Sequence, residues 1–255
     1  MNGKRKTKIE CMIEAVQSNP KLADAWFNLG SLGGGTVDGK HKTKIECFIE
    51  ALHINQKHSH AWSNLGIQGG GTVDGKHKRK DECFIEALHI NPKLADAWCN
   101  LGIDGGGTVD GHYKTAIECC IVALNIDPEQ ADAWCLLGLE GGGTVGDKHK
   151  TIIECYNEAF QLTPQPVQLV GLKNLELDGA YGVVVSYNLN KERYCIQVGK
   201  GGSNLLIKPI LVKSENIMLV KDENDAFVDT LVGATAWGLL RRGEYKLSGT
   251  KRVCF

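Results

Sequence analysis

Three asparagines recur at intervals of 36 residues, each two positions after a tryptophan: Asn28, Asn64 and Asn100. The next position in the series is Leu136. An amide side chain offers a hydrogen-bond donor and an acceptor together, so a row of asparagines can hold the backbone of an extended peptide whatever its side chains are. In the alternative interpretation, the asparagines only solvate an exposed helix face.

Four further polar residues have the same spacing and stand four positions before the members of that series: Asp24, His60, Asp96 and Asp132. Because residues four apart lie on one face of a helix, we expect them to flank the asparagines on the same surface. Together these residues form the predicted peptide-binding site. No catalytic residues are predicted.

The segment GGGTVDGK at residues 33–40 invites a nucleotide-binding interpretation, because Gly34 and the pair Gly39–Lys40 match the start of a P-loop. Position 41 is a histidine, so the hydroxyl that binds Mg²⁺ is missing, and no strand is expected before the segment. We therefore expect surface insertions and no bound nucleotide or other cofactor. In the alternative interpretation, their backbone N–H groups form anion nests.

Ten cysteines could form disulfides or bind zinc. Five recur at the 36-residue period: Cys11, Cys47, Cys83, Cys119 and Cys155. Equivalent positions on successive stacked helices lie too far apart for a disulfide, which needs Cα atoms about 4.4–6.8 Å apart. We therefore expect free thiols in a reducing cytosol or nucleus. Zinc-like clusters of cysteine and histidine are absent from the sequence, so no metal site is predicted.

A 36-residue unit must position these residues. The tryptophans mark its period: Trp26, Trp62, Trp98 and Trp134. The decapeptide GGGTVDGKHK at residues 33–42 recurs unchanged at residues 69–78. A fixed period between about 20 and 50 residues predicts a stacked array of helical or strand units, and such arrays present long binding surfaces.

Each unit is predicted to contain two helices. In the first unit, residues 22–30 place Leu22, Ala25, Trp26 and Leu29 on one apolar face. The glycines at 33–35 are expected to end this helix. A second helix is predicted over residues 40–55, with Asp38 as its N-cap. A proline then ends most units, at positions 20, 92, 128 and 164.

The pattern Trp26–x–x–Leu29–Gly30, followed by Phe48 and Ala51 and, in other copies, by Asn–Pro, resembles the tetratricopeptide repeat (TPR) over about residues 4–164. This unit is two residues longer than the family's 34, and GGGTV replaces the end of the first helix. The resemblance implies an all-α superhelix of helical hairpins whose first helices line a concave groove. The motif AWxNLG is similar to the arrays of O-linked N-acetylglucosamine transferases, where stacked asparagines hold an extended peptide. The resemblance also implies packing roles for one position of the unit: His41, His77, Tyr113 and His149.

The chain starts inside a unit, because residues 3–11 align with residues 39–47. Met12, Ile13 and Val16 leave the first helix with an apolar face, whereas a terminal repeat needs a polar one. We expect either a fragment of a longer repeat protein, which we favour, or an end covered by another chain through self-association.

After Pro164 the period stops and five short strands are predicted: residues 167–170, 181–187, 193–198, 204–207 and 216–220. They resemble a small SH3-like barrel, with Tyr181, Tyr187 and Tyr194 as either binding or packing aromatics. The predicted domains are therefore a solenoid at 1–165, a barrel at 166–220 and a tail at 221–255. The tail is predicted to contain a helix at 226–240 and to end in a basic segment.

The composition does not indicate nucleic acid or a membrane as a partner. The formal net charge is −1, so neither nucleic acid nor an anionic membrane is an expected partner. No uncharged apolar run is long enough to span a bilayer, and the N-terminus lacks the apolar stretch of a secretory signal. We therefore expect a cytoplasmic or nuclear protein.

These patterns favour a non-catalytic adaptor that binds an extended protein segment, with the barrel as a second contact. One alternative is the targeting fragment of a glycosyltransferase, although residues 167–255 are too few for a nucleotide-sugar domain. The other alternative is a self-assembling structural element.

Overall fold

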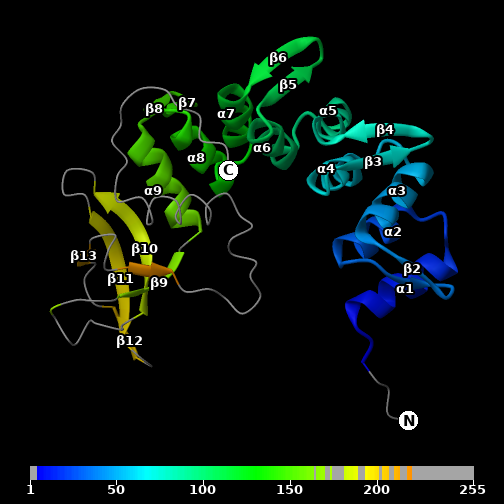
Figure 1. The fold of residues 1–255 in the computed structure, drawn as a ribbon, viewed down its shortest axis with the longest axis horizontal. Helices are drawn as coiled ribbons and strands as arrows, with labels where there is room; N and C mark the ends of the chain where they lie inside the picture. Colours follow the sequence, from blue (N-terminus) through cyan, green and yellow to red (C-terminus); the bar gives the residue numbers. More distant parts are fainter. Residues whose placement is uncertain are drawn as a thin grey trace. The chain divides into compact units, whose positions relative to one another are not determined.

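The computed structural model describes residues 5–163, 165–169, 173, 181–188, 193–200, 203–206, 210–212 and 217–219 (Figure 1). Contacts divide the chain into two units, residues 1–128 and residues 129–255. The first unit alternates long helices, short helices and two-stranded hairpins. The second unit begins with the same arrangement and continues into a sheet.

The first unit contains a long helix followed by three copies of one motif: short helix, β-hairpin, long helix. The long helices are α1 Lys8–Ser18, α3 Lys44–Ile54, α5 Lys80–Ile90 and α7 Ala116–Ile126. The short helices are α2 Ala23–Ser31, α4 Ser59–Ile67 and α6 Ala95–Ile103. The strands are β1 Gly35–Val37, β2 Lys40–Lys42, β3 Gly70–Val73, β4 Lys76–Arg79, β5 Gly106–Val109 and β6 His112–Thr115. The prediction of a helical repeat with paired helices is confirmed.

The β-hairpins between the paired helices are not part of the predicted fold. Strand β1 pairs antiparallel with β2, with Val37 opposite Lys40. Between them, Asp38 and Gly39 have φ angles of 48° and 76°. Two positive φ angles in a two-residue Asp–Gly connection are typical of a type I′ turn, whose twist matches that of the flanking strands. The prediction that Asp38 caps a helix is therefore wrong, because Asp38 forms the hairpin turn.

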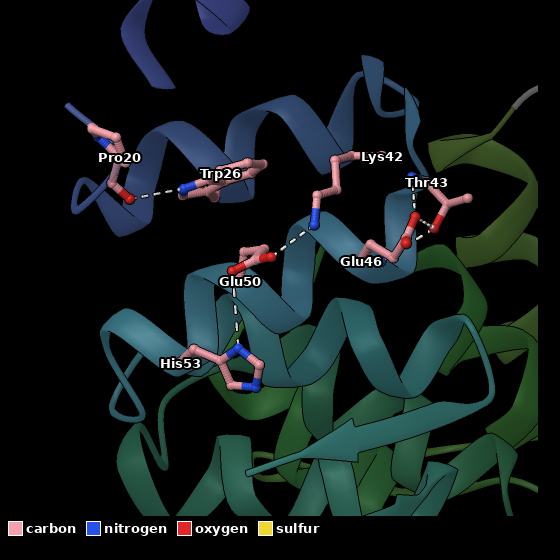
Figure 2. A network of polar contacts seen from close by, with 7 residues as sticks. All are labelled: Pro20, Trp26, Lys42, Thr43, Glu46, Glu50 and His53. Carbon is pink, nitrogen blue, oxygen red and sulfur yellow. Dashed lines mark hydrogen bonds and ion pairs between the residues drawn. The ribbon is translucent and has the colours of Figure 1, made fainter. Parts of the chain in front are cut away.

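Thr43 is the residue that begins the following long helix. Its hydroxyl accepts a hydrogen bond from the Glu46 N–H at 3.3 Å, and its own N–H donates to Glu46 Oε2 at 2.8 Å (Figure 2). This reciprocal capping box satisfies two backbone donors that the helix leaves unpaired. It recurs as Thr7–Glu10, Thr115–Glu118 and Thr151–Glu154.

Each short helix packs on the long helix that follows it through a close contact at a glycine. A Cβ added to Gly30 would lie 2.7 Å from Cε1 of Phe48, and Trp26 and Leu29 are buried beside it. Leu22 was expected on this apolar face, but it is 42% exposed, whereas Leu94 at the equivalent position is 8% exposed. Only a residue without a side chain lets the two helices approach this closely.

The hairpins also join neighbouring repeats, so they are not simple surface insertions as predicted. A Cβ added to Gly35 would lie 3.1 Å from Cδ1 of Ile13 on α1 and 3.2 Å from Cδ1 of Leu29. Val37 is 7% exposed, and Gln17 on α1 donates to Asp38 Oδ1 at 3.0 Å. The hairpin therefore packs both on its own repeat and on the preceding long helix.

The second unit contains a fourth copy of the motif: α8 Ala131–Leu139, β7 Gly143–Val145, β8 Lys148–Lys150 and α9 Ile152–Leu162. It continues with β9 Gln165–Leu169, β10 Tyr181–Asn188, β11 Arg193–Lys200, β12 Ser203–Leu206, β13 Ile210–Val212 and β14 Ile217–Leu219. The strands form an antiparallel sheet in the order β12-β11-β10-β9-β14, and β13 also pairs with β11. Helix α9 packs against β10 (Figure 1).

The prediction of strands in this region is confirmed, but the prediction of a closed SH3-like barrel is not. Among the described strands, no pairing joins β12 or β13 to β14, so the sheet stays open. Val184, Tyr194 and Ile196 are at most 4% exposed, so Tyr194 is a packing residue and not a surface aromatic. The predicted helix at 226–240 and the basic tail lie outside the described residues.

Candidate functional site

The residues proposed from the sequence occupy one exposed face of the short helices. In α2, the buried side chains are Ala23, Ala25, Trp26, Leu29 and Gly30. Positions 24, 28 and 31 follow an i, i+4, i+7 spacing and lie on the opposite side. The same three positions in the next repeats are 60, 64 and 67, then 96, 100 and 103. The face therefore carries three rows that recur once per repeat.

The middle row holds the asparagines. Asn28 is exposed, and Asn64 and Asn100 are half-buried. Nδ2 of Asn100 donates to the carbonyl oxygen of Asp96 at 2.8 Å, so one of its two N–H donors is used inside its own helix. An amide held in this way keeps a fixed orientation toward solvent. Leu136, at the fourth position, is 9% exposed and breaks the row.

The row at the start of each helix is the predicted flanking set. Asp24, His60 and Asp96 are exposed, and Asp132 in α8 of the second unit is half-buried. Asp24 Oδ1 lies 3.2 Å from Nε2 of His58, whose side chain is only 10% exposed. Nδ1 of His58 accepts the Ala61 N–H at 3.1 Å. A neutral His58 therefore carries its proton on Nε2, which faces Asp24.

A cluster of rings joins the first and second repeats at this face, and the sequence patterns did not indicate it. The Phe27 ring lies 4.8 Å from the His58 ring, 5.9 Å from Phe48 and 6.2 Å from His60, measured between centroids. The positions equivalent to Phe27 in the later repeats are Ser63, Cys99 and Cys135. This junction is therefore chemically unlike the others. The signal in the sequence was the departure of one copy from the repeat template.

The third row was also missed. Ile67 is 49% exposed and Ile103 is 38% exposed, and Leu139 holds the same position in the second unit at 47%. Ser31 is the polar member of this row. Each aliphatic residue lies three positions after an asparagine-row residue, so helical spacing alone could have placed it on the site. The face thus combines charged, amide and aliphatic groups across its width.

Lysines of the hairpins form structural ion pairs. Lys42 Nζ lies 2.8 Å from Glu50 Oε1, and this hydrogen bond, with burial opposing it, raises the pKa of Lys42 (Figure 2). The pair recurs as Lys78–Glu86 at 2.7 Å and Lys150–Glu158 at 2.6 Å. Each pair ties the second hairpin strand to the following long helix, so these lysines do not form a free basic surface.

The histidines at the shared hairpin position are exposed, so the prediction that they pack is wrong. His41, His77 and His149 are exposed, and Tyr113 is 64% exposed. They face outward because they lie on a two-stranded hairpin whose opposite side packs on the helices. His77 Nδ1 lies 3.4 Å from Oγ1 of Thr72, its partner across the hairpin.

The repeated cysteines are free thiols, as predicted. Cys47, Cys83, Cys119 and Cys155 are fully buried. Burial raises the pKa of Cys47 and Cys155 to about 11 and that of Cys83 and Cys119 to about 12. Because the thiolate is the reactive form, these side chains are packing groups and not nucleophiles.

Within the described residues, no group of three or more histidine, cysteine, aspartate or glutamate side chains is arranged to hold a metal ion. No helix in that part of the chain has both the length and the apolar character needed to cross a membrane. No protein-family model matches this sequence, and no curated protein matches it either. The interpretation of the site therefore rests on its own geometry.

Proposed function

We propose that this protein is a non-catalytic interaction module that binds an extended peptide along the exposed face of its short helices. The observation that carries the proposal is the three-row face, in which an amide recurs once per repeat between charged and aliphatic positions. Amides recognise the peptide backbone, and the outer rows contact the side chains that alternate to either side of an extended chain.

The scaffold suits this role because the rows are held rigidly. Helices α2, α4 and α6 are each fixed by a tryptophan hydrogen bond at the start, by a glycine contact near the end and by the hairpin that follows. A preformed surface loses little entropy when a peptide binds. Cytoplasmic or nuclear placement and membership of the TPR class remain part of the same proposal.

The test is selection of binders from a displayed library of random linear peptides, followed by affinity measurement. The variant replaces Asn28, Asn64 and Asn100 by alanine. The matched control replaces three exposed hairpin residues, Lys40, Lys76 and His112, by alanine. A hydrogen bond contributes about 1 kcal/mol, so the asparagine variant should bind about 100-fold more weakly and the control should bind like wild type.

Circular dichroism and urea unfolding of both variants check that the fold is retained. Full binding by the folded asparagine variant would refute the amide row as the peptide contact. Sugar transfer by the purified 255-residue chain would replace this proposal with the glycosyltransferase alternative.

A further inference from the structure

The junction between the first and second repeats holds a larger ring than it buries. Phe27 is half-buried there. The residues at the equivalent position of the later repeats are smaller and at most 5% exposed: Ser63, Cys99 and Cys135. The smaller side chains are therefore sufficient to fill this position, and part of the Phe27 ring stays at the surface. Ring surface of this kind is available to a ligand at this junction only.

A carboxylate stands beside this ring. Asp24 precedes Phe27 by three positions on α2, and that spacing makes the two side chains neighbours on the helix surface. The Asp24 side chain is 77% exposed, and its Oδ1 lies 3.2 Å from Nε2 of His58. The His58 ring also lies 4.8 Å from the Phe27 ring, measured between centroids. The three side chains therefore form one cluster, in which the carboxylate and part of the phenylalanine ring face solvent.

The negative charge of Asp24 is not neutralised in this cluster. Nδ1 of His58 accepts the Ala61 N–H at 3.1 Å, so this nitrogen carries no proton and the imidazole is neutral. Nε2 of His58 is buried, and its contact with the carboxylate lacks hydrogen-bond geometry. Within the described part of the chain, no lysine or arginine forms an ion pair with Asp24. The carboxylate therefore keeps its charge and its acceptor capacity for a ligand.

An arginine side chain matches both open parts of the cluster. Its guanidinium is planar and always charged, so it can stack on an aromatic ring while its N–H groups donate to a carboxylate. A lysine ammonium is a compact point charge that pairs with the carboxylate but does not stack. An acidic side chain would be repelled by Asp24. The combination of a ring and an unneutralised carboxylate therefore selects arginine.

We infer that Asp24, Phe27 and His58 form a subsite for an arginine side chain of the extended peptide. The inference rests on the proposed function and extends it, because Asn28, the first amide of the peptide-binding face, follows Phe27 directly. Asp24 pairs with the guanidinium, Phe27 stacks on it, and His58 positions both by packing against them. Only one repeat junction has these residues, so ligands should carry the arginine at one fixed position.

The first test uses peptides selected by the full chain from a displayed library of random linear peptides. The aligned binders should share an arginine at one position. In a synthetic binder, replacing this arginine by citrulline, which has nearly the same shape but no charge, should weaken binding at least about tenfold. With the variant Asp24→Asn, the arginine and citrulline peptides should bind equally. Circular dichroism checks that the variant is folded.

The matched control is Asp110→Asn, which removes an equal charge outside the peptide-binding face. Asp110 is 72% exposed and its Oδ1 lies 3.5 Å from Nε2 of His89, so it is also an exposed aspartate beside a histidine. Asparagine tolerates the φ angle of 50° at this hairpin position. This variant should keep the full preference for arginine over citrulline.

The variant Phe27→Ser tests the ring separately from the charge. Serine is the natural residue at the equivalent position 63. The wild-type chain should prefer the arginine peptide over the same peptide with lysine by about tenfold, and this preference should be lost in Phe27→Ser. Both peptides should still bind the variant better than the citrulline peptide, because Asp24 is retained.

A small probe tests the subsite without any selected peptide. A single side chain binds weakly, so N-acetyl-arginine amide is titrated into the full chain up to about 50 mM. The ring resonances of Phe27 and His58 should shift in a saturable way. N-acetyl-citrulline amide should not shift them, and neither should the arginine probe with Asp24→Asn.

The two tests separate failure of the inference from failure of the proposed function. Selected peptides that bind equally well with arginine or citrulline would overturn the inference and leave peptide binding intact. If no peptide is selected, the proposed function fails, and the arginine probe alone then decides whether the subsite exists. Absence of a saturable shift in the folded wild-type chain would overturn it.

Discussion

The indole Nε1–H of Trp26 donates a hydrogen bond to the carbonyl oxygen of Pro20 at 3.0 Å (Figure 2). The same bond joins Trp98 to Pro92 and Trp62 to Gln56, both at 2.8 Å. The acceptor is a main-chain carbonyl, so the residue before the short helix need not be proline. This explains how Gln56 replaces proline without loss of the contact that fixes the turn between repeats.

Replacing Trp62 by phenylalanine should destabilise the protein by about 1–3 kcal/mol. The substitution removes the indole donor, leaves the Gln56 carbonyl without this partner and creates a small void beside Leu65. Urea unfolding followed by circular dichroism measures the change. In the control Gln56→Pro, the carbonyl is retained, so the indole N–H resonance of Trp62 should keep its hydrogen-bonded shift. An unchanged midpoint for Trp62→Phe would show that the bond is replaced by water.

Replacing Arg79 by threonine should stabilise helix α5 by about 1 kcal/mol. Arg79 stands where the other long helices have a threonine N-cap, and only its N–H bond to Glu82 Oε2, at 2.7 Å, is kept. Threonine restores the missing hydroxyl acceptor. The ion pairs of the Arg79 side chain with Asp81 and Glu82 are lost, but this side chain is 69% exposed, so the pairs contribute little.

The reciprocal substitution Thr115→Arg is the matched control, because it removes the hydroxyl half of the complete capping box of α7 and keeps the backbone half. It should lower the urea midpoint by about as much as Arg79→Thr raises it. The dependence of the unfolding free energy on urea concentration should stay unchanged in both variants. If neither Arg79→Thr nor Thr115→Arg changes the urea midpoint, the packing of neighbouring repeats, and not the helix caps, limits unfolding.

Stability should fall as the pH drops below about 4.5, because the capping glutamates then bind protons more readily in the unfolded chain than in the folded protein. Hydrogen bonds from the backbone and hydroxyl of Thr43 hold the pKa of Glu46 below its ordinary value of 4.5, and those of Thr115 do the same for Glu118. A pKa that is lower in the folded state than in the unfolded state stabilises the fold at pH values above the ordinary pKa. This stabilisation is lost as the pH falls through the folded-state pKa.

The double variant Glu46→Gln/Glu118→Gln tests this cause. It keeps a capping amide without a titratable group, so its urea midpoint should change less than that of wild type between about pH 6 and pH 3. An identical pH dependence in the two proteins would move the acid sensitivity to other carboxylates.

The sequence predicted the helix pairs because their signals are local: apolar residues at helical spacing, a repeated tryptophan and a glycine at each helix crossing. The hairpins were missed although Val37–Asp38–Gly39–Lys40 is a strong turn signal, because the resemblance to a purely helical repeat outweighed it. Ile67 lies three positions after Asn64, so helical spacing could have placed it on the site, but only polar residues were assigned there. The open edge of the sheet depends on long-range pairing, which is not encoded in a short window of sequence.

Replacing Ile67 and Ile103 by serine should weaken peptide binding without reducing stability. The two side chains are 49% and 38% exposed, so their removal leaves no cavity, and Ser31 is the natural residue at the equivalent position. Loss of two aliphatic contacts of partial burial should reduce affinity for peptides selected on the wild-type face by about 10-fold. Titration calorimetry with those peptides measures the loss. The control is Ile45→Ser on α3, a 36% exposed isoleucine of a long helix, which should leave affinity unchanged. If the double variant binds as tightly as wild type while the asparagine variant does not, the peptide contacts only the amide and charged rows.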